Sequence, residues 1–375
     1  MQNEKRKKIL IALADVGNGH RSAANALLKT MEEMNIIDKY DVKVVDLFEV
    51  ADVQPFNSSN ETYTLVSKNK TFEAFNNTLF RAFNTSIGYD LFYWYTMIFM
   101  LKECTAIIEG EAPDLIITVH PIVNMIVNEV KKKTGSKFKT VTVITDLVTL
   151  FKGWADTRAD LTSAPTERAY KLLLEWGLDK EKIIYPLFPI NPSISNFASV
   201  KETMSSLGFQ NDLPLITLTG GGVGTYSLKK AMDIIKVRQD CNVLVICGKS
   251  QSLYNEFTER FSSYSNIKIV GYVNNIQDYF NASEIIIGKP GPATILEIEI
   301  FNKKAILTRP VGQQEKGNVD YALDNKNFRY INENWDILDK TISELLAQKI
   351  EATSRRSVSE TETILTKSLA LIDPL

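Results

Sequence analysis

Residues 9–34 read ILIALADVGNGHRSAANALLKTMEEM, which is an apolar run, a glycine-containing turn and a helix-like stretch in that order. Ile9–Ala14 is short and uninterrupted, as is typical of a strand buried in a parallel sheet. Gly17 and Gly19 permit a tight turn, and Arg21–Met34 has the composition and spacing of a helix. Strand, turn and helix in this order form the repeating unit of a parallel α/β fold.

The same alternation continues along the chain and restarts after Pro189 and Pro192, which disfavour both helix and central strand. The runs interpreted as strands of the first half are Ile9–Ala14, Val42–Val45, Leu115–Val119 and Thr140–Ile144. Those of the second half are Leu215–Thr219, Asn242–Cys247, Ile267–Val270, Ile285–Ile287 and Ala305–Leu307. We therefore predict an α/β protein with two doubly wound halves.

The expected domains are residues 1–192 and 193–357, and a C-terminal helix at about 358–375 is expected to pack back on the first domain. A chain of 375 residues is long enough for two such domains. Ligands of doubly wound folds bind outside the carboxyl ends of the strands, so two facing halves predict a site in a cleft between them. The loops that follow the strands are therefore the most informative segments.

The composition indicates an ordinary globular protein and argues against one class of partner. Hydrophobic residues make up 44% of the chain and charged residues 23%, and 43 basic side chains nearly balance 45 acidic ones. Such a balance creates no overall positive field, so nucleic acid is not an expected partner. The three cysteines, Cys104, Cys241 and Cys247, are odd in number and lack metal-ligand spacing, which fits a reducing cytoplasm.

Apolar run lengths, aromatic residues and lysines indicate what contact with a membrane to expect. The apolar run after the basic residues 1–8 is too short for an export signal, and no stretch reaches about 18 uninterrupted apolar residues. Residues 72–101 are rich in aromatic side chains, Phe92 and Trp94 among them, which pack in a core or lie at a bilayer interface. The lysines between 131 and 139 form a solvated face or attract anionic lipid. Any membrane contact is therefore expected to be peripheral, on the cytoplasmic face.

Both histidines of the chain follow predicted strands. His20 closes the first glycine loop, and His120 follows Leu115–Val119. A neutral imidazole can accept the proton of a hydroxyl nucleophile, and amides at a helix start can stabilise an anion. The alternatives are structural: His20 as a solvated turn residue, and His120 as a residue that orients the turn before Pro121.

Three loops of the second half carry phosphate- or hydroxyl-binding features. The run Thr219–Gly224 contains four glycines and lets the backbone approach a phosphate closely. Lys289–Thr294 leads into a helix that contains Glu297, which suits a diphosphate at the turn and a ribose diol on the carboxylate. A surface charge near a helix start would give the same pattern at Glu297. Gly312–Asn318 carries polar side chains that can bind hydroxyls.

Together, five segments resemble one family. They are Gly17-Asn18-Gly19-His20, Val143-Ile144-Thr145-Asp146-Leu147, the Gly220 loop, Lys289-Pro290-Gly291-Pro292-Ala293-Thr294 and Gln314-Glu315-Lys316-Gly317-Asn318. The chain resembles, over nearly its whole length, the monogalactosyldiacylglycerol synthases and the bacterial processive diacylglycerol glucosyltransferases. These are relatives of the peptidoglycan glycosyltransferase that builds lipid II.

The resemblance implies the GT-B fold, in which two Rossmann-like doubly wound domains face a central cleft. The acceptor would bind residues 1–192 and the uridine diphosphate (UDP) sugar residues 193–357. Loop amides and helix dipoles would stabilise the leaving diphosphate, without a metal or other cofactor. The residues implied for the donor are Gly19, Gly220, Gly221, Gly222, Tyr272, Val273, Lys289, Gly291, Ala293, Thr294, Glu297, Gln314, Glu315 and Asn318.

The implied catalytic groups are His20 and Asp146, either of which would accept the proton of the attacking hydroxyl, although Asp146 could instead cap a helix. The residues assigned to the acceptor or the membrane are Trp154, His120, Phe92 and Trp94. The histidine that the family commonly has near this tryptophan is absent here, and Gln313 stands where glycine is frequent.

The expected function is inverting transfer of glucose or galactose from a UDP-sugar to diacylglycerol, which makes a β-glycosyl-diacylglycerol. An alternative enzyme is a nucleotide-sugar epimerase on the same scaffold, which would need no lipid. An alternative outside catalysis is a UDP-sugar-binding regulator without transfer activity, consistent with the missing histidine.

Overall fold

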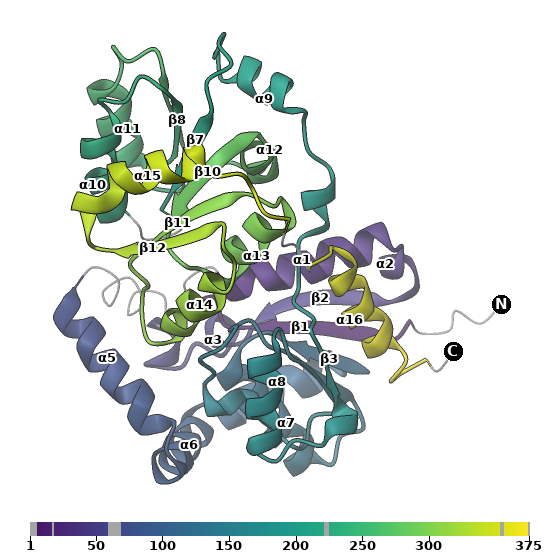
Figure 1. Cartoon of the computed structure of the whole chain (residues 1–375). Coiled ribbons are helices and arrows are strands. Elements are labelled where there is room, and N and C mark those ends of the chain that lie inside the picture. The colour runs from purple at the N-terminus through teal and green to yellow at the C-terminus, as the bar shows by residue number, and fades with distance from the viewer. Residues whose placement is uncertain (1–5, 17–18, 59–68, 221–224, 353–355, 374–375) are drawn as a thin grey trace. The chain divides into compact units, whose positions relative to one another are not determined.

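The computed structural model describes residues 6–16, 19–58, 69–220, 225–352 and 356–373 (Figure 1). The chain divides into two compact units, each with its own sheet. Unit 1 comprises Met1–Pro192, Gly312–Gln314 and Val358–Leu375, and unit 2 comprises Ser193–Val311 and Glu315–Ser357.

The sheet of unit 1 has the strand order β2-β1-β3-β4-β5-β6, and all of its described pairs are parallel. Its strands are β1 (Lys8–Leu13), β2 (Asp41–Asp46), β3 (Leu115–Thr118), β4 (Lys139–Val143), β5 (Leu161–Ser163) and β6 (Ile183–Ile184). The four strands predicted in this half are confirmed within one residue at their ends. Strands β5 and β6 were not predicted, because strands of three and two residues leave no recognisable apolar run.

Helices cover both faces of this sheet, as in a doubly wound fold. The helices of unit 1 are α1 (Gly19–Glu33), α2 (Ile36–Lys39), α3 (Leu47–Ala51), α5 (Lys70–Phe83), α6 (Ser86–Glu111), α7 (Pro121–Thr134), α8 (Glu167–Glu175) and α16 (Ser359–Leu369). Side chains of β1 alternate between the faces: Ile9 and Ile11 pack with α1 and α16, and Leu10 and Ala12 pack with α6 and α7.

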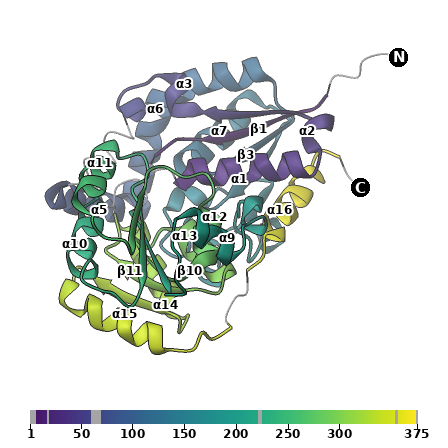
Figure 2. The same ribbon diagram turned by 90° about the horizontal axis from the view of Figure 1, so that it is seen from above.

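Helix α16 returns to unit 1 from the end of the chain and lies against α1 (Figure 2). Ile190 N donates to Thr361 Oγ1 at 2.7 Å, and the same hydroxyl donates to Ile190 O at 2.7 Å. Ile364 and Leu365 are fully buried in the same cluster as the α1 side chains. The two ends of the chain therefore share one core.

Unit 2 has the strand order β12-β11-β10-β7-β8-β9, again with parallel pairs. Its strands are β7 (Leu215–Thr219), β8 (Asn242–Ile246), β9 (Ile267–Val270), β10 (Ser283–Gly288), β11 (Lys304–Thr308) and β12 (Phe328–Asn332). Its helices are α9 (Val200–Ser206), α10 (Thr225–Ile235), α11 (Gln251–Arg260), α12 (Ile276–Ala282), α13 (Pro292–Ile300), α14 (Gln314–Leu323) and α15 (Leu338–Ala347). The five predicted strands are confirmed, and β12, whose run includes Arg329, was missed.

Candidate functional site

Three strand ends of unit 1 bring the candidate catalytic residues together. His20 lies in the first turn of α1, after β1, and its Nδ1 lies 2.7 Å from Val119 O at the end of β3. Thr145 Oγ1, after β4, lies 3.1 Å from the same nitrogen. A carbonyl oxygen can only accept, so Nδ1 carries the proton and donates it to Val119. In neutral His20, Nε2 is therefore the atom with a lone pair.

The surroundings of His20 keep the imidazole neutral. Burial lowers the pKa of His20 to about 4, although the bond to Val119 O and the charge of Asp15 act in the opposite direction. His20 is therefore uncharged at neutral pH. The His20 side chain is half-buried in the first turn of α1, so His20 is not a solvated turn residue.

His120 packs directly against His20. The two ring centroids lie 4.5 Å apart in an edge-to-face arrangement, and Phe48 lies against His120 on another side, at 5.5 Å. Burial, followed by the proximity of His20, lowers the pKa of His120 well below its ordinary value. His120 Nδ1 is buried without a hydrogen-bond partner among the described residues. His120 precedes Pro121 at the start of α7, so the structural interpretation also fits its position.

Asp146 follows β4 and is held by a tryptophan. Trp154 Nε1 donates to Asp146 Oδ2 at 2.8 Å, and the Trp154 ring centroid lies 6.3 Å from that of His20. The next described helical segment is the 3₁₀ turn Lys152–Trp154, which begins after Phe151. Asp146 therefore caps no helix, and that alternative is wrong. Trp154 is fully buried, so it acts inside unit 1, through Asp146.

The aromatic segment is partly core and partly surface. Phe92 stacks on Phe83 at 4.7 Å and meets Phe151 at 5.6 Å, whereas Trp94 is 65% exposed. Within the described residues, α6 is long and apolar enough to cross a membrane by length and composition, which alone is weak evidence. Phe92 thus fits the core interpretation, and membrane contact by the exposed face that carries Trp94 stays a prediction.

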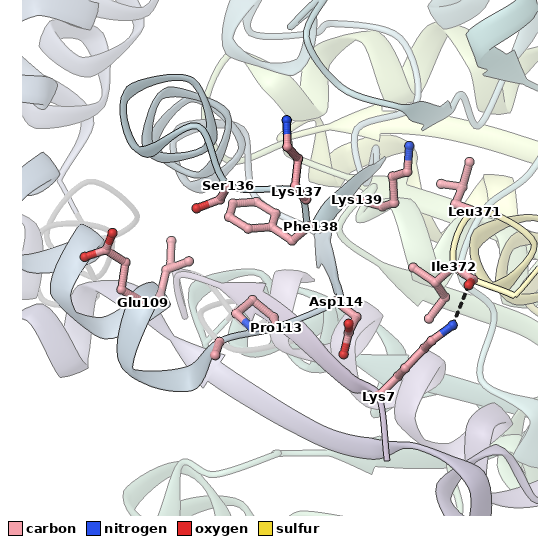
Figure 3. Close-up of a pocket in the computed structure, with 12 residues that line it drawn as sticks. Lys7, Glu109, Pro113, Asp114, Ser136, Lys137, Phe138, Lys139, Leu371 and Ile372 are labelled. Atoms are coloured by element: carbon pink, nitrogen blue, oxygen red, sulfur yellow. Dashed lines mark hydrogen bonds between the residues drawn. The ribbon is translucent and has the colours of Figure 1, made fainter. Parts of the chain in front are cut away.

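A surface pocket of about 520 Å³ lies at the other edge of the same sheet (Figure 3). Lys7, Asp114 and Lys139, which line it, stand at the amino ends of β1, β3 and β4. Figure 3 shows Lys7 donating to Ile372 O, at 2.6 Å. The histidines follow the carboxyl ends of these strands, so this pocket is separate from the candidate site.

In unit 2, two of the predicted donor loops meet. Thr219 at the end of β7, Gly220 after it, Lys289 after β10 and Thr308 at the end of β11 line one small hollow. Gly221 and Gly222 of the first loop lie outside the described residues, as do Gly17 and Asn18 of unit 1.

Glu315 and Asn318 brace the loops around this hollow. Lys289 Nζ forms an ion pair with Glu315 Oε1, and Val311 N donates to Glu315 Oε2 at 2.8 Å. Asn318 Nδ2 donates to Pro290 O at 3.0 Å, whereas its Oδ1 is buried without a partner in the described part of the chain. Gln314 begins α14, immediately before this pair of side chains. Their proposed contacts with sugar hydroxyls stay a prediction.

Helix α13 presents its amino end after Gly291, which occupies the N-cap position. Ala293 and Thr294 lie in its first turn, and Glu297 follows about one turn later. Burial raises the pKa of Glu297 to about 7. The Glu297 side chain is half-buried, and for this reason it takes up a proton more easily than an ordinary surface carboxylate.

Tyr272 and Val273 follow β9 as expected. Tyr272 is 63% exposed and has Lys249 Nζ 5.8 Å from its ring centroid, and Val273 packs against a core cluster of unit 2. The sequence analysis did not single out Lys249, nor Thr145 as a partner of His20. Thr145 stands inside a quoted motif, whereas the contact from Val119 uses a backbone carbonyl and leaves no mark in the sequence.

No group of three or more His, Cys, Asp or Glu side chains in the described ranges is placed to hold a metal ion. The expectation of metal-independent transfer stays a prediction, as does the expected cleft.

Comparisons with known proteins cover both halves. A family model for monogalactosyldiacylglycerol (MGDG) synthase matches residues 20–190, and the glycosyltransferase family 28 C-terminal domain matches residues 215–368. A probable chloroplastic MGDG synthase 2 of Oryza sativa subsp. indica is 31% identical over 334 residues, with 85% of this chain and 69% of the rice protein covered. The chain belongs to the monogalactosyldiacylglycerol synthase family.

Another member of the MGDG synthase family, a probable chloroplastic enzyme of Nicotiana tabacum, is 29% identical over 336 residues. That alignment covers 87% of this chain, which spans 62% of the length of the tobacco protein.

Solved structures show the fold of this family member. MnaA of S. aureus, solved with UDP, aligns with a TM-score of 0.62 at 16% identity, covering 98% of both chains. MurG of Acinetobacter baumannii aligns with a TM-score of 0.61 at 11% identity, covering 97% of this chain and 99% of MurG. These likenesses confirm the predicted GT-B fold.

Proposed function

We propose that this chain is an inverting glycosyltransferase that moves a hexose from a UDP-sugar to diacylglycerol. The names of the relatives favour galactose over glucose. The observation that carries the proposal is the state of His20: a neutral imidazole, with Nδ1 committed to Val119 O and Nε2 left as a proton acceptor. General-base catalysis of hydroxyl attack requires such a group.

The proposed reaction is a single displacement. The free hydroxyl of diacylglycerol attacks the anomeric carbon as the bond from that carbon to the UDP oxygen breaks. The hydroxyl proton moves to His20 Nε2, or to Asp146. UDP leaves with the bonding electron pair, which the amides near Gly220, the amino end of α13 and Lys289 would stabilise. Glu297 would hold the ribose. The product carries a β linkage because the centre inverts.

The acceptor would reach unit 1 from a membrane. Ile87, Leu91, Trp94 and Ile98 are exposed and spaced along one face of α6. The opposite face is packed into the core through Met100 and other side chains. We propose that α6 lies on the bilayer, because spanning it would strip that packed face from the protein.

A hydrogen bond from Tyr93 to an ion-paired carboxylate also holds α6 in unit 1. Arg158 forms ion pairs with Glu129 of α7 and with Asp156, and Tyr93 of α6 donates to Glu129. Insertion of α6 across a bilayer would pull Tyr93 out of this network and remove a donor from the Glu129 carboxylate. We propose a peripheral location on the cytoplasmic face, where the exposed Lys132, Lys133 and Lys137 would attract anionic lipid, whereas Lys131 and Lys139 pair with Asp160.

Mass spectrometry of lipids tests the function. Purified protein is incubated with diacylglycerol vesicles and either UDP-galactose or UDP-glucose, beside the variant His20→Ala. The proposal expects one hexose added to diacylglycerol by the wild-type protein and little by the variant. UDP-sugar converted to another sugar nucleotide without lipid would favour an epimerase. Donor binding without any product would favour a binding regulator and overturn the proposal.

A further inference from the structure

Asn124 is a fully buried amide that none of the proposed chemical steps uses. It lies on α7, one turn after His120, among apolar side chains. Its Oδ1 accepts three hydrogen bonds: from Thr142 Oγ1 at 2.7 Å, from Asn128 Nδ2 at 2.9 Å and from Thr118 Oγ1 at 3.3 Å. The amide is therefore fixed in one orientation, with its NH₂ group directed away from the sheet hydroxyls.

The NH₂ group of Asn124 holds the turn that carries Trp154. Asn124 Nδ2 donates to Gly153 O at 3.0 Å and to Trp154 O at 3.4 Å. This turn lies very close to α7, since a Cβ on Gly153 would come within 2.7 Å of Met125 Sδ. A side chain added at Gly153 would force either the Met125 side chain or the turn to shift.

The same turn ends at the candidate site. The indole of Trp154 donates to Asp146 Oδ2 at 2.8 Å, and its ring lies 6.3 Å from the His20 ring, centroid to centroid. Asn124 thus acts on Asp146 through one intermediate residue. Because buried amide bonds are costly to leave unmade, the turn has one stable position while Asn124 is present.

We propose that Asn124 is a positioning residue, which fixes the Lys152–Trp154 turn so that the Trp154 indole holds the Asp146 carboxylate beside His20. The proposal rests on the proposed function for its kinetic consequence. It assigns Asn124 a role in the turnover step, and none in binding the donor.

The test compares two fully buried amides in different units. Asn124→Asp keeps an acceptor for Thr142 and loses the donor to the turn. Asn327→Asp is the matched control, because Asn327 of unit 2 is equally buried, accepts from Glu351 N and donates to Glu351 O. For Asn124→Asp we expect kcat to fall about 10- to 100-fold with the KM for UDP-galactose unchanged, as expected for a misplaced catalytic group. For Asn327→Asp we expect lower thermal stability with kcat within about threefold of wild type. Equal kcat losses in the two variants would overturn the proposal.

A double-mutant cycle identifies the route. Trp154→Phe removes the indole donor, so Asn124→Asp should have little further effect on kcat in that background. If the fold losses in kcat of the two single variants multiply in the double variant, Asn124 does not act through Trp154, and the proposal is overturned. Gly153→Ala crowds the turn against Met125 without burying a new polar group, and it should also lower kcat if Asn124→Asp does not fold.

A spectroscopic measurement keeps this proposal separate from the proposed function. The indole ¹⁵N–¹H resonances of a protein labelled at tryptophan can be assigned to Trp154 by loss in Trp154→Phe. We expect the Trp154 resonance to move towards that of a free indole in Asn124→Asp and to stay in place in Asn327→Asp. If the wild-type protein transfers no sugar, the proposed function fails, and this resonance alone decides whether Asn124 anchors Trp154. An unmoved resonance overturns the anchoring.

Discussion

At the scale of single residues, the chemistry of unit 1 depends on what surrounds His20. The ring is neutral because it is buried, and it has a defined tautomer because a backbone carbonyl accepts its Nδ1 proton. Asp146 has a different environment, with an indole donor on one oxygen. Substitution of each residue therefore separates the two candidate bases.

The first prediction concerns the pH dependence of His20. Its pKa of about 4 means that the acceptor is lost only in strong acid, so kcat/KM should stay near its plateau from pH 8 to 5 and fall as the pH approaches 4. His20→Gln should lower kcat about 10²- to 10⁴-fold. A decline in kcat/KM centred between pH 6 and 7 would contradict the prediction.

The same pKa affects stability in a defined direction. The unfolded chain takes up this proton near pH 6.5 and the folded chain only near pH 4. The contribution to the free energy of unfolding is therefore complete above pH 6.5 and is lost as the pH falls towards 4. Denaturant titrations at pH 7.5 and pH 5 should show a smaller loss of stability for His20→Gln than for the wild-type protein.

Glu297 shows the opposite dependence. Burial raises its pKa to about 7, so the folded state holds a proton that the unfolded chain releases near pH 4.5. Its stabilising contribution is present below pH 4.5 and is lost as the pH rises through 7. Glu297→Gln should therefore melt at a higher temperature than wild type at pH 8, and at a similar temperature at pH 4.5.

Glu297→Gln should also weaken UDP binding about tenfold or more, because a charge-assisted bond to the ribose is lost. Calorimetric titration with UDP measures this, and Glu259→Gln, at an exposed site on α11, is the control. Unchanged UDP binding in Glu297→Gln would remove the ribose role. Glu297 could be proposed from its place in the motif, but its burial could not, because helix composition does not show which side of α13 faces the sheet.

At the scale of elements, α6 has two faces with different environments. Met100, Cys104 and Ile108 are buried against the sheet, whereas Leu91, Trp94 and their neighbours are exposed. The aromatic composition of residues 72–101 predicted an element that packs in a core or meets a membrane. Only the packed structure shows which side chains do each.

The exposed face of α6 should bind phospholipid vesicles. The double variant Leu91→Ser and Trp94→Ser removes two large exposed apolar side chains, so its binding to anionic phospholipid vesicles should weaken about tenfold or more. Co-sedimentation measures the bound fraction. Val237→Ser, which changes a 70% exposed side chain of unit 2, should bind like wild type. Equal binding by all three proteins would show that α6 does not contact the bilayer.

Element prediction succeeded where the signal is local and failed where it is not. The long apolar runs gave β1, β3, β7, β8, β10 and β11 correctly. Strands β5 and β6 form because neighbouring strands offer them hydrogen-bonding edges, so a run such as Ile183–Ile184 carries no signal of its own. Thr145 and Asn124 also depend on contacts between elements. The Asn124 amide stands out in the apolar stretch around Val123, but its hydrogen-bond partners could not be inferred from the sequence.

At the scale of the whole molecule, unit 1 is built from both ends of the chain. Leu365 of α16 is fully buried with side chains of α1 and the first sheet. Leu365→Ala should lower the free energy of unfolding by about 2–5 kcal/mol, through the cavity that it leaves. Hydrogen exchange by mass spectrometry should show lost protection in β1 and β4.

The matched control is Leu345→Ala, which truncates an equally buried leucine on α15 in the core of unit 2. Its loss of protection should appear in β7 and β8 instead. If Leu365→Ala weakens both units alike, α16 does not belong to unit 1 in solution.

The sequence by itself determined the α/β class, the restart of the pattern after Pro192, and the loops in which the candidate residues lie. These depend on apolar periodicity and on glycine turns, which are properties of neighbouring residues. The order of strands in each sheet and the contacts across it were decided by the tertiary structure alone. His20 meets Val119 across 99 residues because parallel strands bring distant carboxyl ends to one edge of the sheet. Ile190 meets Thr361 across 171 residues because α16 packs back on unit 1. Tautomer, burial and pKa follow from those contacts, so they could not be inferred from the sequence.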